Sequence, residues 1–394
     1  MSGVFEADTA LGEELVALRR RLHAHPEVGL QTPRTQAVIL EALDGLGLEI
    51  TTGRSISSVT AVLRGGRPGP VVLLRADMDG LPVTEATGLD FASADGTMHA
   101  CGHDLHMAGL VGAARMLAAR REELPGTVVL MFEPGEEGYA GARTMLEEGV
   151  LDAAGERPVA AYAIHVDCVT PFGSAVTRSG TIMASASAMR IRVGGTGGHA
   201  AYPHHAVDPV PVAAEIVLAV QAFAARRIPS VDPAVISITR LSSDSLAGNV
   251  LAASVDLEAN IRTLSREALA TIRTELPKLV TAIGEAHGCT MTVEFIDSYP
   301  VTVNDPAETA RVLEVLGERY GDRLVLLAEP GMASEDFAFV LEEVPGSLVF
   351  LGVQPEGATA PMHSERAIFD DSDLAEHAAT FAELAWRRLA SPAE

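Results

Sequence analysis

The chain has 394 residues, 47% of them hydrophobic, which allows a buried core and predicts more than one domain. Its formal net charge of -24 argues against nucleic acid or an anionic membrane surface as partner, because both select for basic patches. An anionic substrate must therefore be bound by local cations rather than by the overall field.

The N-terminus and the cysteines bear on the compartment. The first residues alternate acidic and apolar side chains and lack the basic start and continuous apolar stretch of a signal peptide. No apolar run approaches the ~18–20 residues that span a bilayer. The richest run, residues 211–225, contains a glutamate and a glutamine. The three cysteines fit a reducing compartment better than a disulfide framework, so we expect a cytoplasmic protein.

The first half of the chain alternates predicted helices and strands. Residues 11–23 and 35–46 are expected to be helical. Residues 69–74 and 126–132 are continuous apolar runs beside glycine or proline, which is typical of strands buried on both faces. Between them, residues 105–123 place small and apolar side chains at three- and four-residue steps, which predicts a helix. This order favours an α/β domain with a partly parallel sheet.

The middle of the chain follows another pattern. The expected elements are a strand at 182–193, a helix at 207–227, strands at 234–241 and 254–263, a helix at 267–287 and a strand at 290–298. This order is typical of a small α+β sandwich. We therefore predict an inserted domain, residues 183–298, that splits a larger α/β domain made of residues 1–182 and 299–394.

The densest group of potential metal ligands is the segment MHACGHDLHMA. Its candidates are His99, Cys101, His103, Asp104 and His106. Thiolate and imidazole groups bind zinc-like ions, and imidazole and carboxylate also suit manganese or cobalt. Cys101 and His103 lie two residues apart before a predicted helix, so both can point toward one side. A chance gathering is disfavoured because the chain holds only 12 histidines and three cysteines.

Further candidates follow predicted strands. Glu136 and Glu137 are adjacent on a Pro/Gly turn in FEPGEEG, so one carboxylate can ligate a metal while the other handles a proton. Asp77 lies in RADMDGLPVTE, two residues from a second aspartate, and His165 follows an apolar run. His363 lies in APMHS. Alone, a Glu-Glu pair is more often solvated surface and a single histidine more often structural, so these signals depend on occurring together.

Seven segments together resemble a known family. They are RADMDGLP, MHACGHD, FEPGEEG, the strand end at His165, GGTGGHAAYPH, ASEDF and MHSERAIFDD. From about residue 18 to 371 the chain resembles the aminoacylase-type metallopeptidases of clan MH. The resemblance is to the branch with hippurate hydrolases, auxin-conjugate amidohydrolases and N-acetyl-diaminopimelate deacetylases. It implies a zinc-peptidase-like α/β catalytic domain with an inserted α+β lid and dimerisation domain.

The resemblance also assigns roles to residues. It implies metal ligation by Cys101, His103, Glu137, His165 and His363. Glu136 matches the general base, and Asp77 matches an aspartate beside the metals that is counted as catalytic and that we expect to orient a ligand. The cofactor implied is two divalent ions per subunit, Mn2+, Zn2+, Co2+ or Ni2+.

The inserted domain carries three further candidates. His199 matches a histidine that stabilises the tetrahedral oxyanion, and Asn249 and Arg262 match substrate-binding positions. Arg262 is either a bidentate partner of the substrate carboxylate or a surface salt bridge.

Two departures from the family pattern stand out. Leu105 and Met107 replace small residues and could narrow the site, and the asparagine motif lacks its usual proline. The resemblance further implies a homodimer formed through the inserted domain.

The function implied is cleavage of the amide bond of small N-acyl-amino acids to a carboxylic acid and a free amino acid. A dipeptidase and a hydrolase of carbamoyl or ureido groups on the same scaffold stay open as alternatives. A non-catalytic relative is less favoured, because no ligand or base position is lost.

Overall fold

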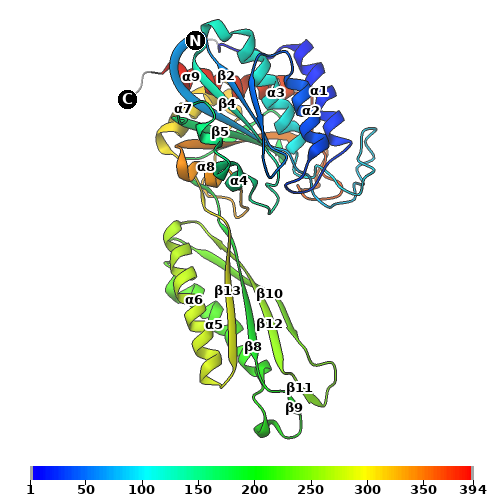
Figure 1. The fold of residues 1–394 in the computed structure, drawn as a ribbon, viewed down its shortest axis with the longest axis vertical. Helices are drawn as coiled ribbons and strands as arrows, with labels where there is room; N and C mark the ends of the chain where they lie inside the picture. Colours follow the sequence, from blue (N-terminus) through cyan, green and yellow to red (C-terminus); the bar gives the residue numbers. More distant parts are fainter. Residues whose placement is uncertain (1–2, 392–394) are drawn as a thin grey trace. The chain divides into compact units, whose positions relative to one another are not determined.

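The structure, a computed structural model, describes residues 3–391 and divides into two compact units (Figure 1). The larger unit holds the described residues of 1–182 and 336–394 together with Val303–Glu329. The smaller unit holds Met183–Thr302 and Pro330–Glu335. The short segment 330–335 thus groups with the smaller unit, whereas the sequence analysis counted it in the larger domain.

The larger unit is built on a mixed sheet. Its strands are β1 (Glu49–Thr52), β2 (Val59–Arg64), β3 (Arg67–Asp77), β4 (Pro125–Glu133), β5 (Ala160–Pro171), β6 (Ala175–Thr177), β15 (Leu324–Leu326) and β16 (Gly346–Gln354). They lie in the order β1-β2-β4-β3-β5-β16-β6-β15. The central strands β4, β3, β5 and β16 are mutually parallel, and β1 and β2 are antiparallel additions at one edge. Strands β7 (Gly180–Met183) and β14 (Thr302–Asn304) pair separately.

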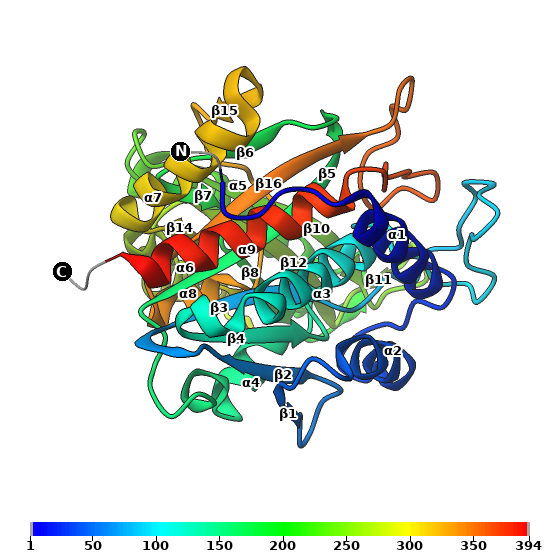
Figure 2. The ribbon, with the colours of Figure 1, turned by 90° about the horizontal axis from the view of Figure 1, so that it is seen from above.

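Helices cover this sheet. They are α1 (Thr9–His23), α2 (Pro33–Leu43), α3 (His103–Ala119), α4 (Gly141–Glu147), α7 (Pro306–Tyr320), α8 (Ala338–Glu343) and α9 (Leu374–Ala390), with 3-10 turns at Arg121–Glu123, Val150–Asp152 and Gly321–Arg323. Helices α3 and α9 lie side by side across the sheet (Figure 2). Because both faces of the central strands are covered, β3 and β4 are buried along their apolar runs.

The smaller unit is a four-stranded antiparallel sheet with two helices on one face (Figure 1). Its elements are β8 (Ala186–Gly194), β9 (Gly198–His199), α5 (Pro209–Arg227), β10 (Ala234–Ser243), β11 (Val250–Leu251), β12 (Ser254–Thr263), α6 (Arg266–Ala286) and β13 (Thr290–Tyr299), with a 3-10 turn at Pro203–His205. The sheet order is β10-β12-β8-β13. The short pair β9–β11 extends the sheet beyond the ends of β8 and β12.

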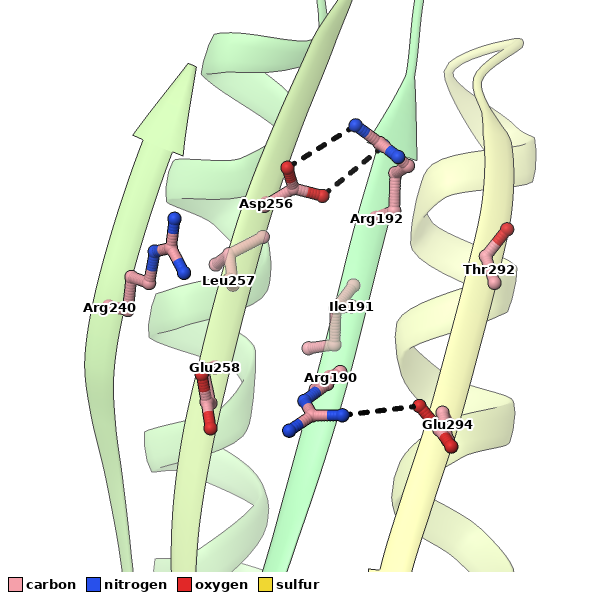
Figure 3. Close-up of a pocket in the computed structure, with 9 residues that line it drawn as sticks. All are labelled: Arg190, Ile191, Arg192, Arg240, Asp256, Leu257, Glu258, Thr292 and Glu294. Atoms are coloured by element: carbon pink, nitrogen blue, oxygen red, sulfur yellow. Dashed lines mark hydrogen bonds and ion pairs between the residues drawn. The ribbon is translucent and has the colours of Figure 1, made fainter. Parts of the chain in front are cut away.

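The helix-free face of this sheet is charged and open to solvent. Arg240, Glu258, Arg190 and Glu294 are register neighbours on four successive strands, so positive and negative side chains alternate across the sheet. Figure 3 shows these side chains around a shallow hollow. The volume of this hollow is about 270 Å³. Ion pairs between neighbouring strands join Arg190 to Glu294 at 3.9 Å and Arg192 to Asp256 at 3.2 Å.

Among the described residues, one helix, α5, has the length and apolar composition that could span a membrane, with a mean hydropathy of 1.3. Val212, Ile216 and Val220 on this helix are buried in the core that it forms with the sheet of the smaller unit. These three apolar residues therefore have partners within the unit.

The predicted fold class, an α/β catalytic domain with an inserted α+β sandwich, is confirmed. Two predicted helix ends were wrong. Helix α2 ends at Leu43 rather than at residue 46, because an extended Asp44 and left-handed Gly45 break the helical path. Helix α3 ends at Ala119 rather than at residue 123, where a 3-10 turn leads into the proline that begins β4.

Candidate metal centre

The candidate ligands meet where the parallel strands of the larger unit end. Strand β4 leads into the turn with Glu136 and Glu137, β5 carries His165, and the loop after β16 carries His363. Carboxyl ends of parallel strands share one edge of a sheet, which is the usual position of an α/β ligand site. Cys101 precedes helix α3 at the same edge.

Gly102 lies between two candidate ligands, Cys101 and His103, whose donor atoms lie within 4.8 Å of each other. It adopts a left-handed conformation with φ 86° immediately before α3. A Cβ atom there would lie 2.4 Å from Val166 Cγ2 and 2.9 Å from a ring carbon of Phe369, so no larger residue fits. Helix α3 begins at His103 itself. The sequence analysis expected the helix to begin at residue 105, with His103 in the loop before it.

Short distances connect the candidate donor atoms. Cys101 Sγ lies 3.6 Å from His165 Nε2 and 3.3 Å from His363 Nε2. His363 Nε2 is also 3.2 Å from Glu137 Oε1. His103 Nε2 lies 4.0 Å from one carboxylate oxygen of Glu136 and 4.0 Å from one of Glu137.

The donors form two overlapping groups that share the thiol. Cys101, His103 and His165 offer one group of ligand atoms, and Cys101, Glu137 and His363 offer the other, with all atoms of a group within 4.8 Å of one another. Ligands about 2.0–2.3 Å from one ion lie at most about 4.6 Å apart, so these spacings suit metal binding after small adjustments. A thiolate shared by two ligand groups suits a pair of neighbouring ions.

The histidine tautomers fit the same use. His103 Nδ1 donates to the carbonyl oxygen of Asp79 at 2.8 Å, and His165 Nδ1 donates to that of Val166 at 2.6 Å. Both rings therefore direct Nε2 toward the group of donors. His103 Nε2 is buried and makes no hydrogen bond, and a metal ion would satisfy such an atom.

Burial and neighbouring charged groups shift the pKa values of two candidate donors, Cys101 and Glu137. Burial raises the pKa of the Cys101 thiol well above its usual value, although His103 opposes this. Burial would also raise the pKa of Glu137, but its bond with His363 and the charge of His103 outweigh burial and lower it. The Cys101 thiol must lose a proton when a metal binds.

Asp77 is buried beside the site with both oxygens engaged. His106 Nδ1 donates to one oxygen at 2.5 Å and Arg75 to the other at 2.8 Å, while His103 Nε2 lies 3.6 Å away. Burial would raise the pKa of Asp77, but His103, His106 and Arg75 lower it well below the usual value. An aspartate held in this way is a weak proton acceptor.

His99 and His106 stand outside the ligand groups that share Cys101. His106 Nε2 accepts from the backbone N–H of Val166 at 2.8 Å and Nδ1 donates to Asp77, so neither ring nitrogen is available. Burial lowers the pKa of His99 to about 4 and that of His106 to about 3, which keeps both rings neutral. Leu105 and Met107, which the sequence analysis expected to narrow the site, are fully buried in the core.

His363 has a strained backbone. Its φ of 65° is one of two positive values among the described residues other than glycine. Its backbone N–H donates to the carbonyl oxygen of Ala100 at 2.8 Å, which ties the loop to the residue before Cys101. Such backbone strain in residues other than glycine is concentrated at functional sites.

The smaller unit positions its three candidates at two places. His199 is exposed on β9 and Asn249 lies beside it, since Ala200 N donates to the carbonyl oxygen of Asn249 at 3.0 Å. Arg262 is half-buried near the far end of β12. Its contacts are marginal, at 3.5 Å to Ser185 O and Ser334 Oγ, and within residues 3–391 no carboxylate pairs with it. Burial lowers the pKa of Arg262. The salt bridge considered for Arg262 is therefore not formed.

Four buried residues beside the candidate ligands were given no role in the sequence analysis. They are Arg75, Asp79, Glu133 and Asp336. Arg75 donates to Asp77, Glu133 and Asp336, and Asp79 holds the Glu136–Glu137 turn. The motif RADMDG offered a signal, because alternate residues of a strand share one face and Arg75 and Asp77 are two apart. Asp336 lies in the quoted segment ASEDF, 261 residues from Arg75 in sequence, and no spacing rule connects it to β3.

A parallel sheet edge that gathers one thiol, imidazoles and carboxylates in overlapping groups is suited to bind metal ions. The chain belongs to peptidase family M20/M25/M40, whose model matches residues 73–387. The predicted class of enzyme, a metal-dependent amidohydrolase, is confirmed, and family and donor groups support two divalent ions.

Individual relatives match over nearly the whole chain. The chain is 36% identical to thermostable carboxypeptidase 1 of Saccharolobus solfataricus, with 91% of each chain covered. It is 35% identical to N-acetylcysteine deacetylase of Bacillus subtilis, over 96% of this chain and 98% of that one. Among solved structures, the YXEP protein of Bacillus subtilis, a dinuclear metal binding peptidase from the M20 family, superposes with a TM-score of 0.84 at 33% identity, covering 98% of this chain and 100% of that one.

Proposed function

We propose that this protein hydrolyses the amide bond of N-acyl-amino acids, releasing a carboxylic acid and a free amino acid, with two divalent ions per chain. The observation that carries the proposal is the pair of donor groups that share Cys101 at the carboxyl edge of the sheet. The named deacetylase among the relatives, which acts on an N-acetylated amino acid, supports this substrate class.

The proposed ligands are Cys101, His103, Glu137, His165 and His363. When bound, the ions would polarise the amide carbonyl and lower the pKa of a water molecule toward neutrality. The set of one thiolate, one carboxylate and three imidazoles accepts zinc, manganese, cobalt or nickel. The cytoplasmic location expected from the sequence stays a prediction.

Glu136 is the proposed general base. The side chain of Glu136 is buried at the site. Its neighbour Glu137 contacts His363 and is a proposed ligand, which leaves Glu136 for proton transfer. Glu136 would take the proton of the attacking water and return it to the leaving amine nitrogen. Asp77 supports the site through Arg75 and His106, since both of its oxygens are already engaged.

His199 is the proposed oxyanion donor. The backbone N–H of Ala201 donates to His199 Nδ1 at 3.1 Å, so the neutral ring carries its proton on Nε2. That N–H is exposed and suited to donate to an oxygen that gains charge in the transition state. Half-buried Arg262, which lacks a carboxylate partner, would bind the α-carboxylate of the substrate. Asn249, beside His199, would contact the acyl group or the amide.

The spacing within the smaller unit supports a homodimer. His199 lies beyond the end of β12 that starts at Ser254, whereas Arg262 lies near the other end. Eight residues of strand span about 26 Å at about 3.3 Å per residue, which exceeds the length of an N-acyl-amino acid. If both side chains act on one substrate, they come from two chains. The exposed apolar side chains Leu218, Val235 and Leu241 on α5 and the edge strand β10 provide surface for such a contact.

A peptidase is the second candidate. The relative named thermostable carboxypeptidase 1 favours it, because the same machinery cleaves a peptide bond when the acyl group is itself an amino acid. Release of free amine from N-acetyl-, N-benzoyl- and indoleacetyl-amino acids and from dipeptides, measured with manganese added, separates the two.

The test of the proposed function is Glu136→Gln. We expect kcat to fall about 10²–10⁴-fold, because the general base is lost while the ligands stay. Metal content should equal that of the wild type by elemental analysis. A variant that keeps more than about a tenth of the wild-type kcat would show that Glu136 is not the base.

Mixing two inactive variants tests the shared site. Glu136→Gln and His199→Ala chains, unfolded together and refolded, form mixed dimers with one intact site if each site uses His199 of the other chain. Random assortment then restores about a quarter of wild-type activity. If each chain builds its own site, mixing restores nothing.

A further inference from the structure

Asp79 connects three segments of the site through one residue. Its two carboxylate oxygens accept the backbone N–H groups of Glu136 at 3.0 Å and of Glu137 at 3.2 Å. Its carbonyl oxygen accepts Nδ1–H of His103 at 2.8 Å. The side chain is 1% exposed, so water does not compete for these bonds.

The backbone around Asp79 is itself held on both sides. Asp77, two residues before it, closes the pairing of β3 with β4 opposite Glu133. Gly80 N donates to the carbonyl oxygen of Glu27 at 2.7 Å, and Leu81 exchanges hydrogen bonds with Met98 at 2.8 and 2.9 Å. Asp79 is therefore a fixed point rather than a mobile side chain.

These contacts determine how the neighbouring side chains point. A hydrogen bond to Nδ1 fixes both the tautomer and the plane of the His103 ring, so Nε2 faces the donors. Two successive N–H groups directed at one carboxylate fix the peptide planes of the turn. The side chains of Glu136 and Glu137 leave the turn in directions set by those planes.

We infer that Asp79 is a positioning residue, which holds His103 and the Glu136–Glu137 turn in one arrangement before any ion binds. Its effect on turnover rests on the proposed function, but its effect on the turn and on metal affinity does not. The preformed arrangement spares the ligands a rearrangement when an ion binds.

The test uses Asp79→Asn, which keeps the shape but offers one acceptor oxygen for two N–H groups. Hydrogen exchange of the metal-free protein should accelerate at the amides of Glu136 and Glu137 relative to those of β4. Affinity for Mn2+ alone and for Co2+ alone should fall about 10–100-fold. With substrate, kcat should fall in the same range while KM changes less than about threefold.

Two further variants protect the test against loss of stability. Asp305→Ala is the control for lost stability, because one oxygen of Asp305 accepts two backbone N–H groups, those of Ala307 and Glu308, at the start of α7. It should lower thermal stability, since the helix loses its cap, and leave metal affinity unchanged. Asp79→Glu keeps both oxygens one methylene further out and should also weaken metal binding. It carries the test if Asp79→Asn does not fold.

The inference is overturned if the Asp79 variant keeps wild-type exchange at both amides and wild-type metal affinity, or if Asp305→Ala weakens metal binding as much. Exchange and metal affinity are measured without substrate. A wild-type protein that binds metal but cleaves no N-acyl-amino acid would therefore refute the proposed function without affecting the role of Asp79.

Discussion

Arginine–carboxylate pairs occur in two different settings in this protein. In the larger unit, Arg75 donates to three carboxyl groups at 2.8, 2.8 and 3.0 Å, and none of these side chains is more than 2% exposed. In the smaller unit, Arg192 and Asp256 pair at 3.2 Å on the open face of the sheet, with 60% and 47% of their side chains exposed (Figure 3).

The two settings differ in what the pairs can do. A buried charge that loses its partner cannot be solvated, so the buried pairs are coupled to one another and to the residues around them. An exposed pair is screened by water and contributes little. The buried pairs therefore support the geometry of the candidate metal centre. The exposed pairs give the open face of the smaller unit's sheet a charged, solvated surface.

The buried cluster also contains a carboxyl group with a raised pKa. Burial, and then the charge of Glu133, raise the pKa of Asp336 well above its usual value.

The largest expected effect on stability follows from Arg75→Met. The substitution keeps the apolar stem and leaves three buried carboxyl groups without their cation, so unfolding should become easier by about 3–5 kcal/mol. Urea unfolding followed by fluorescence reports on this unit, because Trp386, the single tryptophan, lies on α9. A loss below about 1 kcal/mol would mean that the cluster is no more coupled than a surface pair.

The smallest expected effect follows from Arg192→Ala. The exposed pair with Asp256 should contribute about 0.2–1 kcal/mol to the stability of the smaller unit, and less at high salt. Calorimetry of Arg192→Ala, Asp256→Ala and the double variant gives the coupling energy. A coupling energy above about 2 kcal/mol would contradict the contrast between the buried and the exposed pairs.

The sequence predicted more of the sheet than of the buried cluster. Apolar runs revealed β3 and β4, and the strand predicted at 254–263 matches the bounds of β12, because periodicity is a local property. The exposed β1 and the two-residue strands β9 and β11 were missed, since they are too short or too polar to show a period.

For the site, the sequence predicted residue types better than contacts. The proposed ligands were chosen by motif and resemblance, and the structure brings all of them to one edge of the sheet. The contacts of Asp79 with a turn 57 residues away, and of Arg75 with Asp336, depend on strand order, which no local pattern encodes.

The central claim is a two-ion centre in which Cys101 serves both ligand groups, and metal stoichiometry tests it most directly. Elemental analysis of the wild type, of Cys101→Ala and of Cys168→Ala, a control cysteine that is also buried in the larger unit, compares the three proteins under one metal supply. The account predicts two divalent ions per chain for the wild type and Cys168→Ala, and fewer than two for Cys101→Ala. Two ions retained in Cys101→Ala, or a wild type that binds none, would contradict it.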